Sequence, residues 1–303
     1  MNDTVPPAAA GGGDAVPPAA AGDAVPPTGA GGGDASTPAG AGQHGGTRPA
    51  GTDGGAPAGL LASRRVVVVG GASGIGRATV AAAAAAGAAV AVLDADTAGA
   101  DSAAAQARAA GARAWARGVD VTVEAEVAGA LDAAAADLGG IDAVLHVAGV
   151  MRGQGLDVRD VPVALWAQVI AVNLTGPFLV AKHSARHLRP DGGVLVLVGS
   201  KAGVQTGSGS VPYGASKGGL HGLALTLARQ LGPQGIRVHA LCPGDIDTPL
   251  MRRSLDEARA NGTGGDRIAA VEATLGRPED VASVLVLLAS PASAGLAGTV
   301  WTG

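Results

Sequence analysis

Short, continuously apolar runs alternate with alanine-rich stretches of helical length from about residue 60 onwards. Each run is apolar at successive positions rather than at every second one, which is typical of strands buried on both faces. Regular strand–helix alternation favours a parallel sheet of about seven strands with helices on both faces, a doubly wound Rossmann-like α/β fold. The predicted strands are residues 65–71, 88–96, 112–120, 141–149, 192–200, 236–244 and the final GTVWTG, and the predicted helices are 75–86, 97–110, 122–138, 162–188, 213–231 and 278–289.

Residues 1–58 follow a different pattern. Related segments (DTVPP, DAVPP, DAVPP and DASTP) recur there between spacers of glycine and alanine. Almost no large apolar side chain is available to compensate the entropy lost on ordering. We therefore expect a disordered tail at 1–58 with some polyproline II character, followed by a single domain at 59–303. Such a tail could be a passive extension or an arm that docks a partner.

Composition narrows the functional class. The formal net charge is −4 and no basic block is present, so neither nucleic acid nor an acidic membrane surface is the expected partner. The single cysteine, Cys242, excludes an internal disulfide and fits a reducing compartment. The start of the chain lacks the features of a signal peptide. We expect a cytoplasmic protein without a membrane span and, because His146, His183, His187 and His221 show no ligand spacing, without a metal.

The first predicted strand runs directly into GGASGIG, residues 70–76, and then into a helix. Gly70, Gly74 and Gly76 would let the backbone turn tightly and approach a pyrophosphate at the helix amino terminus. The spacing alone is a weak signal in a chain with 51 glycines. The preceding VVVV and the helix-forming run that follows strengthen it, so the segment predicts a dinucleotide site.

Two carboxylates follow the next strands. Asp94 ends the second strand, where a carboxylate can accept both ribose hydroxyls of NAD and would repel the 2′-phosphate of NADP. No arginine or lysine stands at 72, 73 or 95 to bind that phosphate, so NAD is expected and NADP less so. Two alternatives remain: Asp94 could cap the helix near Thr97, and Asp120 could either contact adenine or cap the helix after it.

Tyr213 is the single tyrosine, and Lys217, one of three lysines, stands one helical turn after it. A phenol titrates near 10 and is a poor base at neutral pH. Lowering the pKa of Tyr213 by about three units would make the phenol a general acid and base; an ammonium on the same helical face can supply much of this shift, and a nearby oxidised nicotinamide ring would add to it. Ser200, at the end of the fifth strand, would hydrogen-bond the same substrate oxygen. The alternative is that Tyr213 is a packed residue with a solvated hydroxyl.

Taken in order, GGASGIG, AVNLTGPF, Ser200, YGASK and CPGDIDTP resemble the short-chain dehydrogenase/reductase family, over residues 60–303. The resemblance implies an NAD(H)-dependent oxidoreductase that interconverts a secondary alcohol and a ketone. It also implies that Lys217 holds the nicotinamide ribose and that Asn173 keeps a water in a proton relay. A homotetramer or dimer packed through 162–188 and 213–231 is implied as well. The implied catalytic residues are Asn173, Ser200, Tyr213 and Lys217; the cofactor contacts are Gly70, Ser73, Gly74, Ile75, Gly76, Asp94, Asp120, Val121, Ala148, Gly149, Tyr213, Lys217, Pro243, Gly244, Ile246 and Thr248.

Three positions depart from the family pattern. Val69 stands where the family usually has threonine, and His146 and Val147 stand where it has two asparagines. The side-chain tie between these segments is thereby lost, so we expect a repacked contact and an effect on cofactor affinity. The alternatives are a non-catalytic dinucleotide-binding regulator and an NADP-dependent ketoreductase of the 3-oxoacyl type.

Residues 250–275 are expected to form a lid over the site. Leu250 and Met251 suggest an apolar pocket for a small alcohol or ketone. We expect Arg252 and Arg253 to face water, with a substrate carboxylate as the alternative partner.

Overall fold

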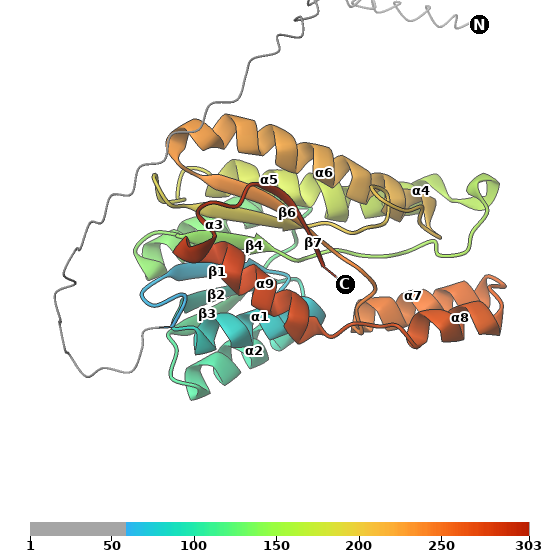
Figure 1. The fold of residues 1–303 in the computed structure, drawn as a ribbon, viewed down its shortest axis with the longest axis horizontal. Helices are drawn as coiled ribbons and strands as arrows, with labels where there is room; N and C mark the ends of the chain where they lie inside the picture. The colour runs from blue at the N-terminus through green and yellow to red at the C-terminus, as the bar shows by residue number, and fades with distance from the viewer. Residues whose placement is uncertain (1–58, 303) are drawn as a thin grey trace, which may run out of the picture. The chain divides into compact units, whose positions relative to one another are not determined.

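The computed structural model describes residues 59–302; the tail predicted at 1–58 lies outside them. Within these residues a parallel sheet has the strand order β3-β2-β1-β4-β5-β6-β7 and lies between two layers of helices (Figure 1). This confirms the predicted fold. The strands are β1 (Arg65–Val69), β2 (Ala89–Asp94), β3 (Ala114–Gly118), β4 (Ala143–His146), β5 (Val194–Val198), β6 (Arg237–Pro243) and β7 (Gly298–Thr302).

Each face of the sheet packs against its own set of helices. Val66 and Val68 of β1 join the core under one layer, while Val67 and Val69 join the core under the other. Burial on both faces is the reason why the strands read as unbroken apolar runs. One layer contains α1 (Gly74–Ala85), α2 (Thr97–Ala109) and α9 (Pro278–Ala289), and the other contains α3 (Glu124–Leu138), α4 (Val163–Ile170), α5 (Gly176–Ser184) and α6 (Val211–Leu231) (Figure 1).

The strand order reverses between β1 and β4, because the chain moves outward from β1 to β3 and then returns to the other side of β1. A crevice forms at such a reversal, beyond the carboxyl ends of the strands. At this end of the sheet lie α7 (Pro249–Ala260) and α8 (Gly265–Glu272), which form the segment expected as a lid (Figure 1).

The prediction of one continuous helix at 162–188 is wrong. A π-helical turn at Ala171–Thr175 separates α4 from α5, and α5 ends at Ser184. The side chain of Asn173 lies in this wider turn and binds the backbone of Val150 at both ends: Oδ1 accepts from the amide nitrogen and Nδ2 donates to the carbonyl oxygen, each at 2.8 Å. Such π-turns are frequent at functional sites.

Within the described residues, Val163–Ser184 is the helical stretch long and apolar enough by composition to cross a membrane. In this fold α4 packs against α6 and α5 against α3. Packing accounts for the inner side of the stretch, whereas Val163, Trp166 and Phe178 remain exposed on its outer side.

Candidate functional site

The glycine-rich loop after β1 has the geometry of an anion cradle. Gly70 has φ +89°, and a Cβ there would overlap the amide nitrogen of Ala148. A Cβ on Gly76 would overlap the carbonyl oxygen of Gly70. Ser73, the N-cap of α1, makes no side-chain capping bond, so it leaves the amide groups of the first turn for another acceptor. The loop therefore fits the diphosphate of a dinucleotide.

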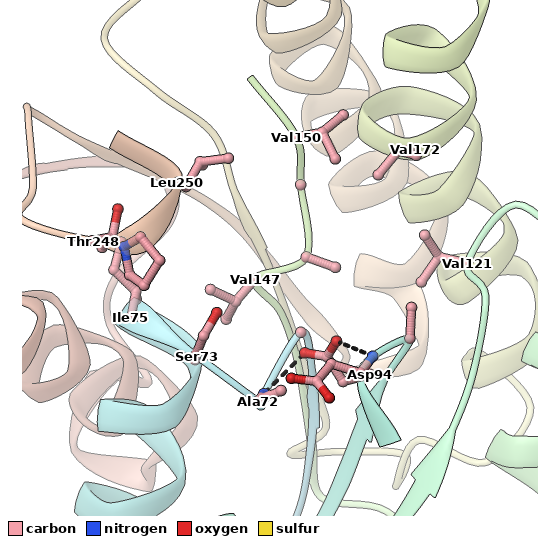
Figure 2. A pocket seen from close by; sticks show the side chains of 18 of the residues that line it. Ala72, Ser73, Ile75, Asp94, Val121, Val147, Val150, Val172, Thr248 and Leu250 are labelled. Carbon is pink, nitrogen blue, oxygen red and sulfur yellow. Dashed lines mark hydrogen bonds between the residues drawn. The ribbon is translucent and has the colours of Figure 1, made fainter. Parts of the chain in front are cut away.

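This loop forms one wall of a cavity of about 580 Å³ (Figure 2). The ends of β2, β3 and β4 and the start of α7 form the other walls. Most of the predicted cofactor contacts line it, namely Gly70, Ser73, Gly74, Ile75, Gly76, Asp94, Asp120, Val121, Ala148, Gly149 and Thr248. We call this cavity the dinucleotide cleft.

Asp94 lies in the dinucleotide cleft and holds the glycine-rich loop. Its Oδ2 accepts from the amide of Ala72 at 2.9 Å, and its Oδ1 accepts from the amide of Asp96 at 3.0 Å (Figure 2). The N-cap of α2 is Asp96, which accepts from Gly99, so the capping alternative for Asp94 is wrong. A carboxylate has about four acceptor sites, so both oxygens of Asp94 keep capacity for ribose hydroxyls.

Asp120 does not cap α3 either. Its Oδ1 accepts from the amide and the hydroxyl of Thr122, at 2.8 and 2.7 Å. This local turn delays the helix, which begins at Glu124 with Val123 as its N-cap, two residues later than predicted. Asp120 lines the dinucleotide cleft.

The three predicted reacting groups meet in a second cavity, of about 80 Å³. Ser200, Tyr213 and Lys217 line it, and Ile75, Gly149 and Thr248 are shared with the dinucleotide cleft. The remaining predicted cofactor contacts, Pro243, Gly244 and Ile246, line it too. Ser200 and Tyr213 also border a third cavity of about 500 Å³, which we call the substrate cavity. The hydroxyls therefore lie between the two larger spaces.

Tyr213 departs from the sequence-based expectation in one respect. Only 7% of it is exposed, and burial raises its pKa to about 12, although a hydrogen bond with Ser200 acts in the lowering direction. Burial also lowers the pKa of Lys217 to about 8. The Lys217 Nζ lies 5.7 Å from the centroid of the Tyr213 ring and donates to the carbonyl of Val198 at 2.9 Å. The protein groups by themselves therefore do not produce the expected lowering of the tyrosine pKa, because loss of solvation outweighs the hydrogen bond with Ser200.

Asn173 and Lys217 converge on Gly149. A Cβ at Gly149 would lie 3.3 Å from Asn173 Oδ1 and 3.5 Å from Lys217 Nζ. Asn173 Nδ2 also donates to Ser216 Oγ on α6 at 3.1 Å, which ties the π-turn to the helix of Tyr213. The structure thus brings Asn173 next to the predicted reacting groups.

A family model described as enoyl-(acyl carrier protein) reductase matches residues 70–302. This chain belongs to the short-chain dehydrogenase/reductase family. The cis-4-hydroxycyclohexanecarboxylate dehydrogenase of Sinomonas cyclohexanicum is 39% identical over 241 residues, which cover 79% of this chain and 94% of the relative. The 2-(S)-hydroxypropyl-CoM dehydrogenase 3 of Xanthobacter autotrophicus is 32% identical over 80% of this chain and 95% of the relative.

A solved structure agrees with this assignment. The short-chain dehydrogenase from Burkholderia cenocepacia in complex with NADP has a TM-score of 0.71 and 30% identity, and the match covers 80% of this chain and 97% of that one. The relatives are named as dehydrogenases that act on hydroxyl groups. This short-chain dehydrogenase/reductase is therefore an oxidoreductase of the alcohol–carbonyl type.

In this short-chain dehydrogenase/reductase the segments at Val69 and His146 are tied through the backbone. The carbonyl of Val69 accepts from the amides of Val147 and Ala148, at 2.7 and 2.9 Å. The His146 ring is completely buried, and neither of its nitrogens has a partner among the described residues. Burial, with a smaller contribution from the charge of Lys217, lowers the pKa of His146 to about 3. The expected repacked contact is therefore a backbone bond beside a neutral, buried imidazole.

Ser210 positions the start of the helix that carries Tyr213, and the sequence analysis missed it. It caps α6, accepting from the amide of Tyr213 at 3.2 Å, and it donates to the carbonyl of Arg152 at 2.6 Å. The helix begins at Val211 rather than at the predicted Tyr213. A serine followed two residues later by Pro212 is a capping signal that could have been found.

Both arginines at the start of α7 are exposed, as expected, but their surroundings differ. Arg252 binds both carboxylate oxygens of Asp247, at 2.8 and 2.7 Å. Arg253, in contrast, lines the dinucleotide cleft. No local sequence signal separates the two neighbours, because only the packing of α7 decides which one faces the cleft.

Cys242 is 1% exposed, and burial raises the pKa of its thiol. This fits a small buried residue rather than a nucleophile. No group of three or more potential metal ligands occurs among residues 59–302.

Proposed function

We propose that this protein is an NAD(H)-dependent dehydrogenase that interconverts a small secondary alcohol and its ketone. The observation that carries the proposal is that Ser200, Tyr213 and Lys217 line one cavity between the dinucleotide cleft and the substrate cavity. A bound nicotinamide would supply the hydride chemistry.

The chain's own groups would handle the proton. With a pKa raised to about 12, the Tyr213 phenol is protonated at neutral pH and can donate to a carbonyl oxygen as that carbon is reduced. In the opposite direction the phenol first releases its proton to solvent through the relay, and the phenolate oxygen then takes the proton of the alcohol. The Ser200 hydroxyl would hydrogen-bond the reacting oxygen and stabilise the charge that develops on it.

Lys217 and Asn173 would support this transfer. Lys217 would hold the nicotinamide ribose, and its ammonium would stabilise a phenolate at Tyr213. Asn173, anchored to Val150 and close to Gly149, would position a water in the relay that returns the proton to solvent.

The lining of the substrate cavity combines apolar and polar side chains, which fits a substrate with an apolar body and a polar substituent. Met151, Met251 and Leu255 contribute to its apolar part; Met251 was expected there, whereas Leu250 lines the dinucleotide cleft instead. Gln154 also lines it, and its buried Oε1 has no partner among the described residues, so it is free to accept from a polar substituent. A cyclic alcohol, the kind of substrate named for the Sinomonas relative, would suit this lining.

NAD rather than NADP is the proposed cofactor because the carboxylate of Asp94 would repel a 2′-phosphate. We expect Asp94→Asn to weaken NAD binding about 10- to 100-fold, since hydrogen bonds to a charged group contribute about 1.5–3 kcal/mol. We also expect the variant to bind NADP better than the wild type does. Titration calorimetry with both dinucleotides measures these changes.

Asp101→Asn is the matched control for Asp94→Asn, because Asp101 is an exposed carboxylate of α2 that does not line the cleft. It should leave both affinities within twofold. A wild-type preference for NADP would overturn the role given to Asp94 and favour the alternative of an NADP-dependent ketoreductase.

The non-catalytic regulator is not favoured by any observation at the site. Such a protein would be free to lose Tyr213 or Lys217, yet both line the reacting cavity with Ser200. Absence of NAD(H) or NADP(H) turnover across a broad panel of alcohols and ketones would revive it.

We propose a homo-oligomer, a tetramer or a dimer, built through the exposed apolar side chains of α4, α5 and α6, among them Val163, Trp166 and Phe178. We expect the double variant Trp166→Glu/Phe178→Glu to reduce the mass in light scattering to that of a smaller assembly, because charges would be buried at the interface. Leu60→Glu, at an exposed leucine outside these helices, should leave the mass unchanged. A wild-type protein that is already monomeric would contradict the proposal.

Cytoplasmic location, and the role of residues 1–58 as a tail separate from the domain at 59–303, stay predictions. Deleting residues 1–58 should leave stability and turnover unchanged, which thermal unfolding and an NAD reduction assay would measure.

A further inference from the structure

Arg253 differs from the other arginine at the start of α7. Arg252 is held by Asp247 through two hydrogen bonds. Arg253 makes no hydrogen bond or ion pair with any described residue, although it stands in the wall of the dinucleotide cleft. It also lines a side cavity of about 320 Å³ next to Gly149 and Val150. Its guanidinium is therefore available to a ligand.

Arg253 balances part of the negative charge in the dinucleotide cleft. Three carboxylates, Asp94, Asp96 and Asp120, line the cleft, and Arg253 is the cation among the lining residues. A dinucleotide brings two further negative charges on its diphosphate. Without Arg253, only the amide groups at the start of α1 would attract the diphosphate, and the three carboxylates would repel it.

The position of α7 brings Arg253 toward the glycine-rich loop. A Cβ on Gly74 would lie 3.0 Å from Cγ2 of Thr248, the N-cap of α7, so this helix begins directly against the loop. Arg253 stands about one helical turn after Pro249, the first residue of α7. The amino terminus of α1 and the first turn of α7 thus face the same part of the cleft.

We propose that Arg253 binds the diphosphate of the dinucleotide, on the side opposite the amino terminus of α1. The guanidinium donates paired hydrogen bonds to the phosphate oxygens, a geometry that it shares with other arginine–phosphate contacts. The contact fastens the α7–α8 segment, and with it the lid of the substrate cavity, to the bound cofactor. This inference rests on the proposed dinucleotide binding.

The test uses the full chain and three probes: NAD, ADP and adenosine. We expect Arg253→Gln to weaken NAD and ADP about tenfold or more in titration calorimetry and to leave adenosine, which lacks phosphate, unchanged. Raising the salt concentration should weaken ADP binding to the wild type more than to the variant. Arg253→Lys should recover part of the loss, because it keeps the charge but not the paired hydrogen bonds.

Arg252→Gln is the matched control, since it removes the same charge one residue away from an arginine that already has a partner. It should leave all three affinities within twofold. Equal binding of NAD and ADP by Arg253→Gln and the wild type would overturn the inference. A raised KM for the alcohol with unchanged NAD affinity would also overturn it and assign Arg253 to a substrate carboxylate.

The two levels of failure are distinguishable. If the wild type binds neither NAD nor NADP, the proposed function fails. If the wild type binds NAD and Arg253→Gln binds it equally well, only the inference on Arg253 fails.

Discussion

Tyr213→Phe is expected to lower kcat about 10²- to 10⁴-fold in both directions, the range that loss of a general acid–base group produces. The substitution removes the hydroxyl that carries the proton and keeps the ring that fills the buried position. Binding of NAD should change little, because the glycine-rich loop and Asp94 are untouched. Steady-state turnover with a secondary alcohol, together with calorimetric titration of NAD, measures both effects.

Thr226→Ala is the control for Tyr213→Phe. It removes a hydroxyl from the exposed side of the same helix, where Thr226 bonds only to the carbonyl of Gly222 among the described contacts. Its turnover should equal that of the wild type. Full turnover in Tyr213→Phe would show that another group transfers the proton and would refute the role assigned to this tyrosine.

The second large effect concerns acid stability and His146. In the folded protein the pKa of His146 is about 3, whereas an unfolded histidine titrates near 6.5. Between these values the unfolded chain binds a proton that the folded chain does not, so stability falls as the pH is lowered from 6.5 toward 3. At about pH 4.5 the expected loss is about 3 kcal/mol, from two pH units at 1.36 kcal/mol each.

His146→Leu should remove this part of the acid sensitivity. It should also raise the free energy of unfolding at neutral pH by about 1–3 kcal/mol, because two buried nitrogens without partners are replaced by an apolar group of similar size. Urea unfolding at neutral pH and at about pH 4.5 measures both changes.

His239 provides the comparison for His146. Burial lowers the pKa of His239 as well, but its ring nitrogens contact Arg237 and the carbonyl of Gly298. His239→Gln should therefore reduce the acid sensitivity less than His146→Leu does. An unchanged pH dependence in His146→Leu would mean that its imidazole is solvated or paired in solution.

Much of the fold could be predicted from the sequence because the relevant signals are local. Burial on both faces of a parallel sheet requires unbroken apolar runs, and these runs marked every strand to within a few residues. The predicted helix boundaries were wrong where a side chain hydrogen-bonds to nearby backbone. Asp120 delays the start of α3, and the π-turn at Asn173 divides the long helix predicted at 162–188. Helix propensity does not account for such hydrogen bonds.

The candidate site was found from the sequence to the extent that it depends on spacing. One helical turn separates Tyr213 from Lys217, and the glycines of the first loop stand at the end of a strand, so their proximity follows from local geometry. The proximity of Ser200 to Tyr213 and Lys217 follows from the topology, because the carboxyl ends of parallel strands share one edge of the sheet.

The sequence by itself determined the parallel α/β architecture, and it predicted the dinucleotide loop and the reacting groups. Only the tertiary structure decided the pKa values of the buried groups and which of the two arginines, Arg252 or Arg253, lines the cleft. The pKa values of Tyr213 and His146 depend on solvent excluded by residues far away in the chain, and the choice of Arg253 over Arg252 depends on how α7 packs. Desolvation and packing arise from the whole fold, so no short stretch of sequence contains them.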